Sequence, residues 1–277
     1  PRLAEYFGIK SHVGMTSYLS VLSKTYPYTI LITEDDDEVR CFLERELSLH
    51  FKIRTVANGK DALRVLEEEE ISLVVSDVMM PEMNGFELCR TIKSQLPFSH
   101  IPVILLTALT DERQRIFGIT GGADDYIQKP FHTDYVKIKI IHLLQERQKL
   151  RERLLEKLRD NKLLLSEPEK VESIDDAFLR KFAEQIEAVY ADPEYNVEKL
   201  SETLGLSRGH LHRKIKELTG TAPVEFLRTY RLNKATQLLR QNAYTVSEVA
   251  YRTGFSSPAY FSKCFKAVYG VTPTEYQ

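Results

Sequence analysis

Residues 76–85 read SDVMMPEMNG and decide how the first half of the chain is interpreted. The apolar run from Ile71 to Val75 leads into them and stops at Asp77, as expected of a strand buried on both faces. A proline and the pair Asn84-Gly85, residue types that favour turns, follow at once. The stretch therefore predicts a buried strand that ends in one carboxylate beside a shaped loop.

Short apolar runs alternate with helical patterns over residues 28–147. Strand-like runs recur at 28–33, 51–56, 72–77, 101–107 and 125–127. Apolar residues at helical spacing separate them at 39–49, 60–69, 85–95, 111–118 and 132–147. This alternation predicts an α/β domain with a five-stranded, doubly wound parallel sheet of the flavodoxin-like type. In such sheets, ligands bind beyond the carboxyl ends of the strands.

Polar side chains mark those strand ends. Glu34 and Asp35 follow the first strand, Asp77 ends the third, Thr107 ends the fourth, and Lys129 follows the fifth. Crowded carboxylates repel one another unless a cation joins them, and hard oxygen ligands favour Mg²⁺. A carboxylate such as Asp77 can also form an acyl phosphate. The pattern therefore predicts a Mg²⁺-dependent phosphoryl-acceptor site, with Lys129 and Thr107 placed for the phosphoryl oxygens.

At these residues the chain resembles the receiver domain of response regulators. The resemblance rests on Glu34-Asp35, the block from Asp77 to Gly85, Thr107-Ala108, the run 122–126 and Lys129-Pro130, in order and at family spacing. It implies a receiver over residues 28–147 with Asp77 as phosphoacceptor. It implies a metal site formed by Glu34, Asp35, Asp77 and the carbonyl of Met79. It also implies that phosphorylation is sensed by Thr107, Tyr126 and Lys129.

A phosphatase of the haloacid-dehalogenase-like class is an alternative interpretation of the same residues. That class also uses a strand-end aspartate with Mg²⁺, but it needs a second aspartate two residues later as general acid. Met79 stands at that position and cannot transfer a proton. We therefore expect no enzyme activity beyond the uptake and loss of the chain's own phosphoryl group.

Residues 148–170 form a charged segment that predicts a helical linker. No proline or glycine occurs from His142 to Glu167, and strong helix formers fill the segment. Leu143, Leu150 and Leu164 recur at multiples of seven, but charged residues interrupt the repeat. A short coiled coil and a solvated tether both remain open.

The last part of the chain contains one unit twice. Residues 197–207 align with 246–256 at an offset of 49, and residues 211–226 align with 261–276 at an offset of 50. Each unit predicts a helix, a glycine turn and a serine-capped second helix, which is a helix-turn-helix. Pro223 begins a longer helix that joins the units. The pattern resembles an AraC-type DNA-binding domain, all-α, over residues 171–277.

This resemblance implies that the second helix of each unit contacts DNA bases. In the first unit the corresponding residues are Gly209, His212 and Arg213. In the second unit they are Pro258, Ala259, Tyr260 and Lys263. Glycine, proline and alanine offer no side-chain donor, so base contacts at those three positions conflict with the chemistry. We expect phosphate contacts from Arg208, Lys214, Lys216 and Lys266.

The composition places limits on location and partners. The 277 residues carry a formal net charge of −2, with the acidic excess in the first half, so DNA binding must depend on local basic clusters. Three widely spaced cysteines indicate a reducing compartment, and no apolar run is long enough to span a membrane, so we expect no membrane contact. Together with the resemblances this predicts the bacterial cytoplasm. Residues 1–27 match neither domain and stay unassigned.

The two halves together predict a phosphorylation-controlled transcription regulator of a two-component system. A histidine kinase would phosphorylate Asp77, and phosphorylation would promote a homodimer and DNA binding. The order of domains is similar to the C-terminal part of hybrid two-component regulators, and a sequence that begins at Pro1 fits a piece of a longer chain. A kinase on a separate chain is equally compatible. The alternative function is a phosphate-independent interaction module with a vestigial DNA-binding half.

Overall fold

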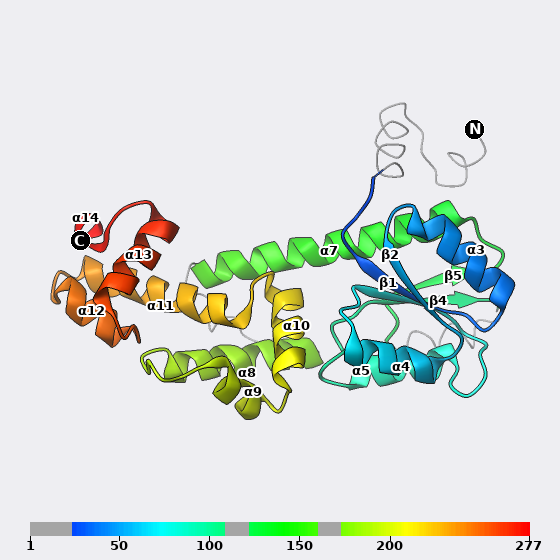
Figure 1. Ribbon diagram of the computed structural model, residues 1–277, viewed down its shortest axis with the longest axis horizontal. Coiled ribbons are helices and arrows are strands. Elements are labelled where there is room, and N and C mark those ends of the chain that lie inside the picture. The colour runs from blue at the N-terminus through cyan, green and yellow to red at the C-terminus, as the bar shows by residue number, and fades with distance from the viewer. Residues whose placement is uncertain (1–23, 109–121, 160–172) are drawn as a thin grey trace. The chain divides into compact units, whose positions relative to one another are not determined.

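The computed structural model describes residues 24–108, 122–159 and 173–277. The chain divides into two compact units, and the division falls between Glu146 and Arg147. Figure 1 shows the elements of both units along the chain. The helix predicted at 111–118, residues 160–170 of the predicted linker and most of the unassigned first 27 residues lie outside the described residues.

The first unit contains the predicted parallel sheet. Its strands are β1 (Thr29–Thr33), β2 (Lys52–Val56), β3 (Leu73–Asp77), β4 (Val103–Thr107) and β5 (Asp125–Gln128). All neighbours are parallel, in the order β2-β1-β3-β4-β5. The connections change direction between β1 and β3, and the crevice at such a switch point is where ligands of this architecture bind. The predicted five-stranded doubly wound sheet is confirmed.

Helices cover both faces of this sheet and bury its apolar side chains. They are α3 (Asp37–Ser48), α4 (Gly59–Glu68), α5 (Gly85–Ser94) and the first part of α7 (Thr133–Arg159). Helices α3 and α7 pack on one face, around Leu43 and Ile140, whereas α4 and α5 pack on the other, around Leu66 and Leu88 (Figure 1). Strand β3 is buried along its whole length, as its continuous apolar run predicted.

Helix α7 combines the helix predicted at 132–147 with the first part of the predicted helical linker. It continues without interruption to Arg159, so the first part of the predicted linker belongs to the same helix. Because this stretch has no proline or glycine, nothing in the local sequence ends the helix.

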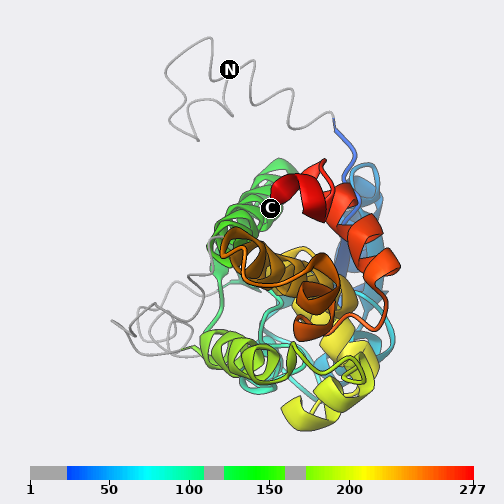
Figure 2. The ribbon, with the colours of Figure 1, turned by 90° about the vertical axis from the view of Figure 1, so that its left-hand side faces the viewer.

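The second unit is entirely helical where it is described. Its helices are α8 (Ile174–Val189), α9 (Val197–Leu204), α10 (Arg208–Thr219), α11 (Pro223–Arg240), α12 (Val246–Arg252), α13 (Pro258–Tyr269) and α14 (Pro273–Tyr276). The pairs α9–α10 and α12–α13 are the two predicted helix-turn-helix units, and α11 connects them (Figure 1, Figure 2). No helix among the described residues has the length and apolar character needed to cross a membrane.

The internal repeat is visible in the helix ends. Ser207 caps α10 and Ser257 caps α13, and each helix ends at a left-handed glycine, Gly220 or Gly270. These equivalences share the offset of 50, so the inserted residue lies before α13, and the capping residue is Ser257 rather than its neighbour Ser256. Glycine suits both ends because a positive φ is strained for other residues.

Candidate functional site

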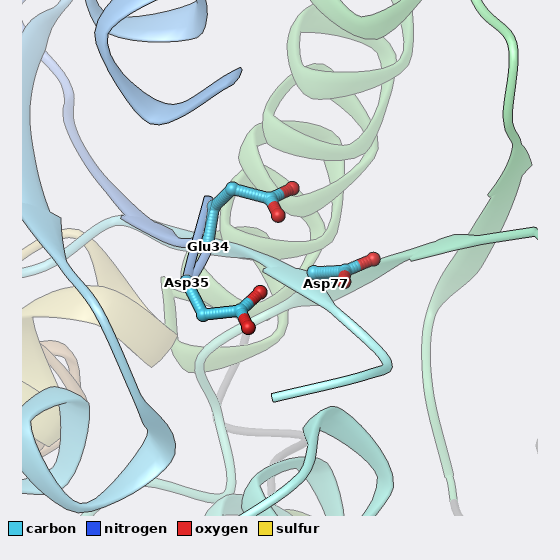
Figure 3. A group of neighbouring side chains, drawn as sticks. All are labelled: Glu34, Asp35 and Asp77. Atoms are coloured by element: carbon cyan, nitrogen blue, oxygen red, sulfur yellow. The ribbon is translucent and has the colours of Figure 1, made fainter. Parts of the chain in front are cut away.

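Three carboxylates meet at the switch point of the sheet. Glu34 and Asp35 follow β1, and Asp77 ends the adjacent strand β3. One ligand oxygen from each of the three lies within 4.8 Å of the others (Figure 3). Glu34 and Asp77 are 2% and 6% exposed, whereas Asp35 is exposed to solvent. The predicted convergence of these residues is therefore present.

Lys129 joins two of the carboxylates. Its Nζ atom lies 2.9 Å from Oε2 of Glu34 and 2.9 Å from Oδ1 of Asp77. Its backbone N–H donates to the carbonyl of Thr107 at 2.7 Å, which holds the end of β5 against the end of β4. Lys129 precedes Pro130 through a cis peptide bond.

The electrostatics of this cluster follow from its burial and its pairs. Burial raises the pKa of Glu34, the hydrogen bond from Lys129 opposes that shift, and the charge of Asp77 adds to it. Burial also disfavours the ammonium of Lys129, but its hydrogen bonds to Asp77 and Glu34 outweigh burial and raise the Lys129 pKa. The ammonium of Lys129 thus pairs with two of the three acidic groups in the cluster. This all-oxygen donor set fits a hard divalent cation that keeps some of its waters.

The loop after β3 is shaped by a close backbone approach. The backbone N–H of Gly85 donates to the carbonyl of Val78 at 3.0 Å. A Cβ atom on Gly85 would lie 2.1 Å from the carbonyl oxygen of Asp77, so only glycine fits there. Asn84 caps α5 through a reciprocal capping box with Glu87. Met79, in this loop, exposes 67% of its surface, which leaves its side chain outside the cluster.

Thr107 and Tyr126, the predicted switch pair, lie on neighbouring strands. Thr107 is half-buried at the end of β4, and Tyr126 of β5 pairs in register with Leu105 of β4. The Tyr126 hydroxyl is buried and has no hydrogen-bond partner among the described residues. Burial, together with the nearby Cys89 and Asp124, raises its pKa to about 12. A neutral phenol is therefore directed into the domain, where the ring packs against the layer formed by α4 and α5.

Most of the predicted DNA contacts lie on the outer faces of α10 and α13. In each helix the inward positions are fully buried: Leu211 and Ile215 in α10, Phe261 and Phe265 in α13. The exposed positions are Arg208, Gly209, His212, Lys216, Ala259, Tyr260, Lys263 and Lys266. Arg213 and Pro258 are half-buried.

Lys214 is the exception, and its predicted phosphate contact is wrong for this structure. Its side chain is 0% exposed, forms an ion pair with Asp175 of α8, and places its Nζ atom 5.1 Å from the centre of the Phe178 ring. Position 214 lies three residues after Leu211 and next to Ile215, so it shares the inward face of α10. That spacing indicated burial of Lys214, which argues against a surface role. Its partner Asp175 is 39 residues away in the sequence, so the ion pair itself could not be predicted from a local pattern.

Comparisons with known proteins agree with the two halves of this structure. Residues 30–141 match the model of the response regulator receiver domain, and residues 200–277 match the model of a helix-turn-helix domain. Histidine kinase P4 of Formosa agariphila is 39% identical over 249 residues, which cover 90% of this chain and 18% of that protein. The transcriptional regulatory protein GltR of Pseudomonas aeruginosa is 44% identical over 121 residues, which cover 43% of this chain and 50% of that protein.

Among solved structures, the receiver domain of the sensor histidine kinase PA1611 from Pseudomonas aeruginosa is 25% identical. The match covers 43% of this chain and 99% of that one, with a TM-score of 0.39, and that structure has a magnesium ion coordinated in the active site cleft. The chain spans about half the length of GltR and less than a fifth of histidine kinase P4. Its residues 30–141 belong to the response regulator receiver family, and they are joined to an AraC-type helix-turn-helix domain over residues 200–277.

Proposed function

We propose that this chain is a transcription regulator of a two-component system whose DNA binding is controlled by phosphorylation of Asp77. The observation that carries the proposal is the cluster at the switch point. Three carboxylates have ligand oxygens within 4.8 Å of one another, and the ammonium of Lys129 forms the ion pairs described for two of them, Glu34 and Asp77. Such a cluster holds excess negative charge until a cation binds, which suits a site that must accept a phosphoryl group.

In this proposal an oxygen of Asp77 attacks the phosphorus of a phosphohistidine on the kinase. The bond from phosphorus to the histidine nitrogen breaks, and an aspartyl phosphate forms on Asp77. A Mg²⁺ ion held by Glu34, Asp35, Asp77 and the Met79 carbonyl supplies positive charge to the phosphoryl oxygens when it is bound. Lys129, already beside Asp77, donates to one phosphoryl oxygen.

The switch pair would carry this change to the surface of the domain. The Thr107 hydroxyl, at the end of β4, would donate to a second phosphoryl oxygen and leave space that the Tyr126 ring can occupy. The altered surface would favour a homodimer and DNA binding. The phosphoryl donor is a histidine kinase, either earlier in the same polypeptide or on a separate one.

A phosphodonor experiment tests the chemistry. Wild-type protein incubated with acetyl phosphate and Mg²⁺ should gain one acid-stable, base-labile phosphoryl group, detected as a mass shift of the intact chain. Asp77→Asn should gain none. Asp37→Asn, which removes an exposed carboxylate from the first turn of α3, is the matched control and should gain the group as wild type does. Equal labelling of the Asp77→Asn variant would place the phosphoacceptor elsewhere.

A selection experiment tests the DNA-binding half. Genomic fragments retained by the protein should share a sequence motif, and retention should rise after phosphorylation. Arg213→Ala should relax the preference at one base position, because arginine reads guanine by a bidentate pair that discriminates by about 1–3 kcal/mol. Lys216→Ala should weaken all sequences alike and lower the salt slope by about one. No salt-dependent DNA binding in either phosphorylation state would favour the phosphate-independent interaction module.

Light scattering tests the dimer. The mass of the phosphorylated protein should rise towards that of two chains at a lower concentration than the mass of the unmodified protein. One unchanged mass in both states over the whole concentration range would contradict the dimerisation step and leave the chemistry at Asp77 untouched.

A further inference from the structure

A cavity of about 300 Å³ lies within the helical unit, between its two helix-turn-helix pairs. Its walls come from α9, α10, α11, α13 and the turns before them. Figure 1 and Figure 2 show α11 passing from one pair to the other, which places this helix beside both second helices. The cavity therefore takes its lining from both helix-turn-helix pairs and from the helix that joins them.

The charged lining of the cavity is basic. Three arginines, Arg208, Arg228 and Arg231, line it together with one carboxylate, that of Glu198. Tyr260 contributes its phenol from the first turn of α13. A cavity whose charged groups are mostly guanidinium favours an anion, and the planar fork of a guanidinium matches the two oxygens of a phosphate.

The three arginines differ in how they are held. Arg231 donates to the backbone carbonyls of Tyr190 and Asp192 at 2.8 and 2.7 Å, which fixes it as a support for the turn after α8. Arg208 instead pairs with Glu198 at 2.7 Å, and Arg228 pairs with a glutamate one turn earlier in α11 at 3.1 Å.

Both of these latter ion pairs lie at the surface. The side chains of Arg208 and Arg228 are 72% and 38% exposed. Ion pairs of this kind contribute little to stability, because water screens the charges. Arg208 and Arg228 can therefore replace their carboxylate partner with a phosphate at little cost. Arg231 would have to give up its hydrogen bonds to two backbone carbonyls.

Arg228 also connects the cavity to the second reading helix. It hydrogen-bonds the hydroxyl of Tyr260, and this bond is the main cause of its raised pKa. Arg208 and Tyr260 are themselves among the predicted DNA contacts, one from each unit. The lining of the cavity therefore includes one predicted DNA contact from each unit.

We propose that this cavity binds one backbone phosphate of the DNA strand that runs between the two major grooves, through Arg208, Arg228 and the hydroxyl of Tyr260. The proposal rests on the proposed DNA-binding function and adds the connecting helix α11 to the contact surface. Two units that read successive grooves have a phosphate backbone between them. A phosphate held by α10, α11 and α13 together would set the spacing of the two reading helices on the duplex.

Arg228→Gln tests this directly on the full chain, with the duplex of highest affinity from the genomic selection as the probe. The variant should lower the salt slope by about one and leave the sequence motif unchanged, as loss of one phosphate contact requires. Arg228→Lys should restore the slope, because it keeps the charge. Lys181→Gln removes one exposed positive charge from α8, away from the cavity lining, and should leave the slope unchanged.

A scan of single methylphosphonates along the same duplex then locates the phosphate. One neutral substitution between the two recognised segments should weaken wild-type binding by about tenfold but leave the binding of Arg228→Gln unchanged. If wild type binds all duplexes equally or none, the proposed function itself fails. If wild type binds a motif but every methylphosphonate that weakens its binding also weakens the binding of Arg228→Gln, this inference alone is wrong. Chemical shifts of Tyr260 that respond to inorganic phosphate, together with a scan that shows no such position, would identify a free anion as the ligand instead of DNA.

Discussion

Asp35→Asn should make the first unit more stable without magnesium and less stable with it. Asp35 contributes one of three carboxylates whose ligand oxygens lie within 4.8 Å of one another. At that distance two unit charges repel by about 3.5 kcal/mol for an effective dielectric constant of about 20. The substitution removes the repulsion with both Glu34 and Asp77. No ion pair with Lys129 is lost, because the ion pairs described for this ammonium are those with Glu34 and Asp77.

The net effect is smaller than this sum because Asp35 is exposed and water screens its charge. We expect a gain of about 1 kcal/mol in the free energy of unfolding of the metal-free unit. If the proposed site binds magnesium, the ion at about a hundred times its dissociation constant would stabilise the wild-type unit by about 2.7 kcal/mol. The variant loses a ligand and should lose most of that gain, so the order of stability reverses when the ion is added.

Hydrogen–deuterium exchange of the full chain, followed by mass spectrometry on peptides from β1 and β3, measures this without separating the units. In EDTA the Asp35→Asn peptides should exchange about fivefold more slowly than wild type, which corresponds to about 1 kcal/mol. In MgCl₂ they should exchange faster. Glu44→Gln, at an exposed acidic position farther along α3, should follow wild type in both buffers. A variant that is destabilised in EDTA and still protected by Mg²⁺ would refute the idea that these carboxylates form a strained cation site.

Three further predictions concern burial. The pKa of Glu34 is raised in the folded state, so ionisation of Glu34 lowers the stability of the fold as pH rises above about 4.5. Denaturant titrations should therefore show Glu34→Gln to be more stable than wild type at pH 7. This difference should vanish below about pH 4. Gly85→Ala should destabilise the first unit by about 1–3 kcal/mol or more in the same titrations, because its Cβ would meet the Asp77 carbonyl. Gly209→Ala should be neutral or stabilising, because its Cβ meets nothing within 4 Å. Asp175→Asn should lower the melting temperature of the helical unit more than Lys214→Met does, because removing the carboxylate leaves the buried ammonium without that partner, at a cost of about 3 kcal/mol.

The strands of the first unit could be predicted from the sequence to within two residues at each end. The inner strands β1, β3 and β4 are buried along most of their length and appear as short, largely apolar runs, with turn residues between them. The edge strands β2 and β5 are partly exposed and mix polar with apolar residues. The meeting of Glu34, Asp77 and Lys129 could also be predicted, because parallel strands bring their carboxyl ends to one edge of the sheet. The roles assigned to these residues remain predictions.

Other features depended on contacts between distant parts of the chain. The burial of Lys214 requires Asp175 and Phe178 of α8, and a basic residue in a basic helix gives no local sign of such a partner. The cavity beside α11 is formed by four helices, so no short motif marks Arg228. Helix α7 shows the opposite case, because its local sequence favours helix throughout, and the helix continues across residue 147, where the two compact units divide.

The two helix-turn-helix units keep large apolar residues at equivalent buried positions but differ in chemistry at their outer positions. Leu211 and Ile215 correspond to Phe261 and Phe265 inside, whereas Arg208 and Gly209 correspond to Pro258 and Ala259 outside. A twofold-symmetric dimer reads a palindrome, which looks the same from either end. Two unlike helix-turn-helix units joined by the continuous helix α11 would instead recognise an asymmetric sequence, which reads differently from its two ends. Inverting that sequence would turn the bound domain around, so each half of a dimer's operator would have its own direction.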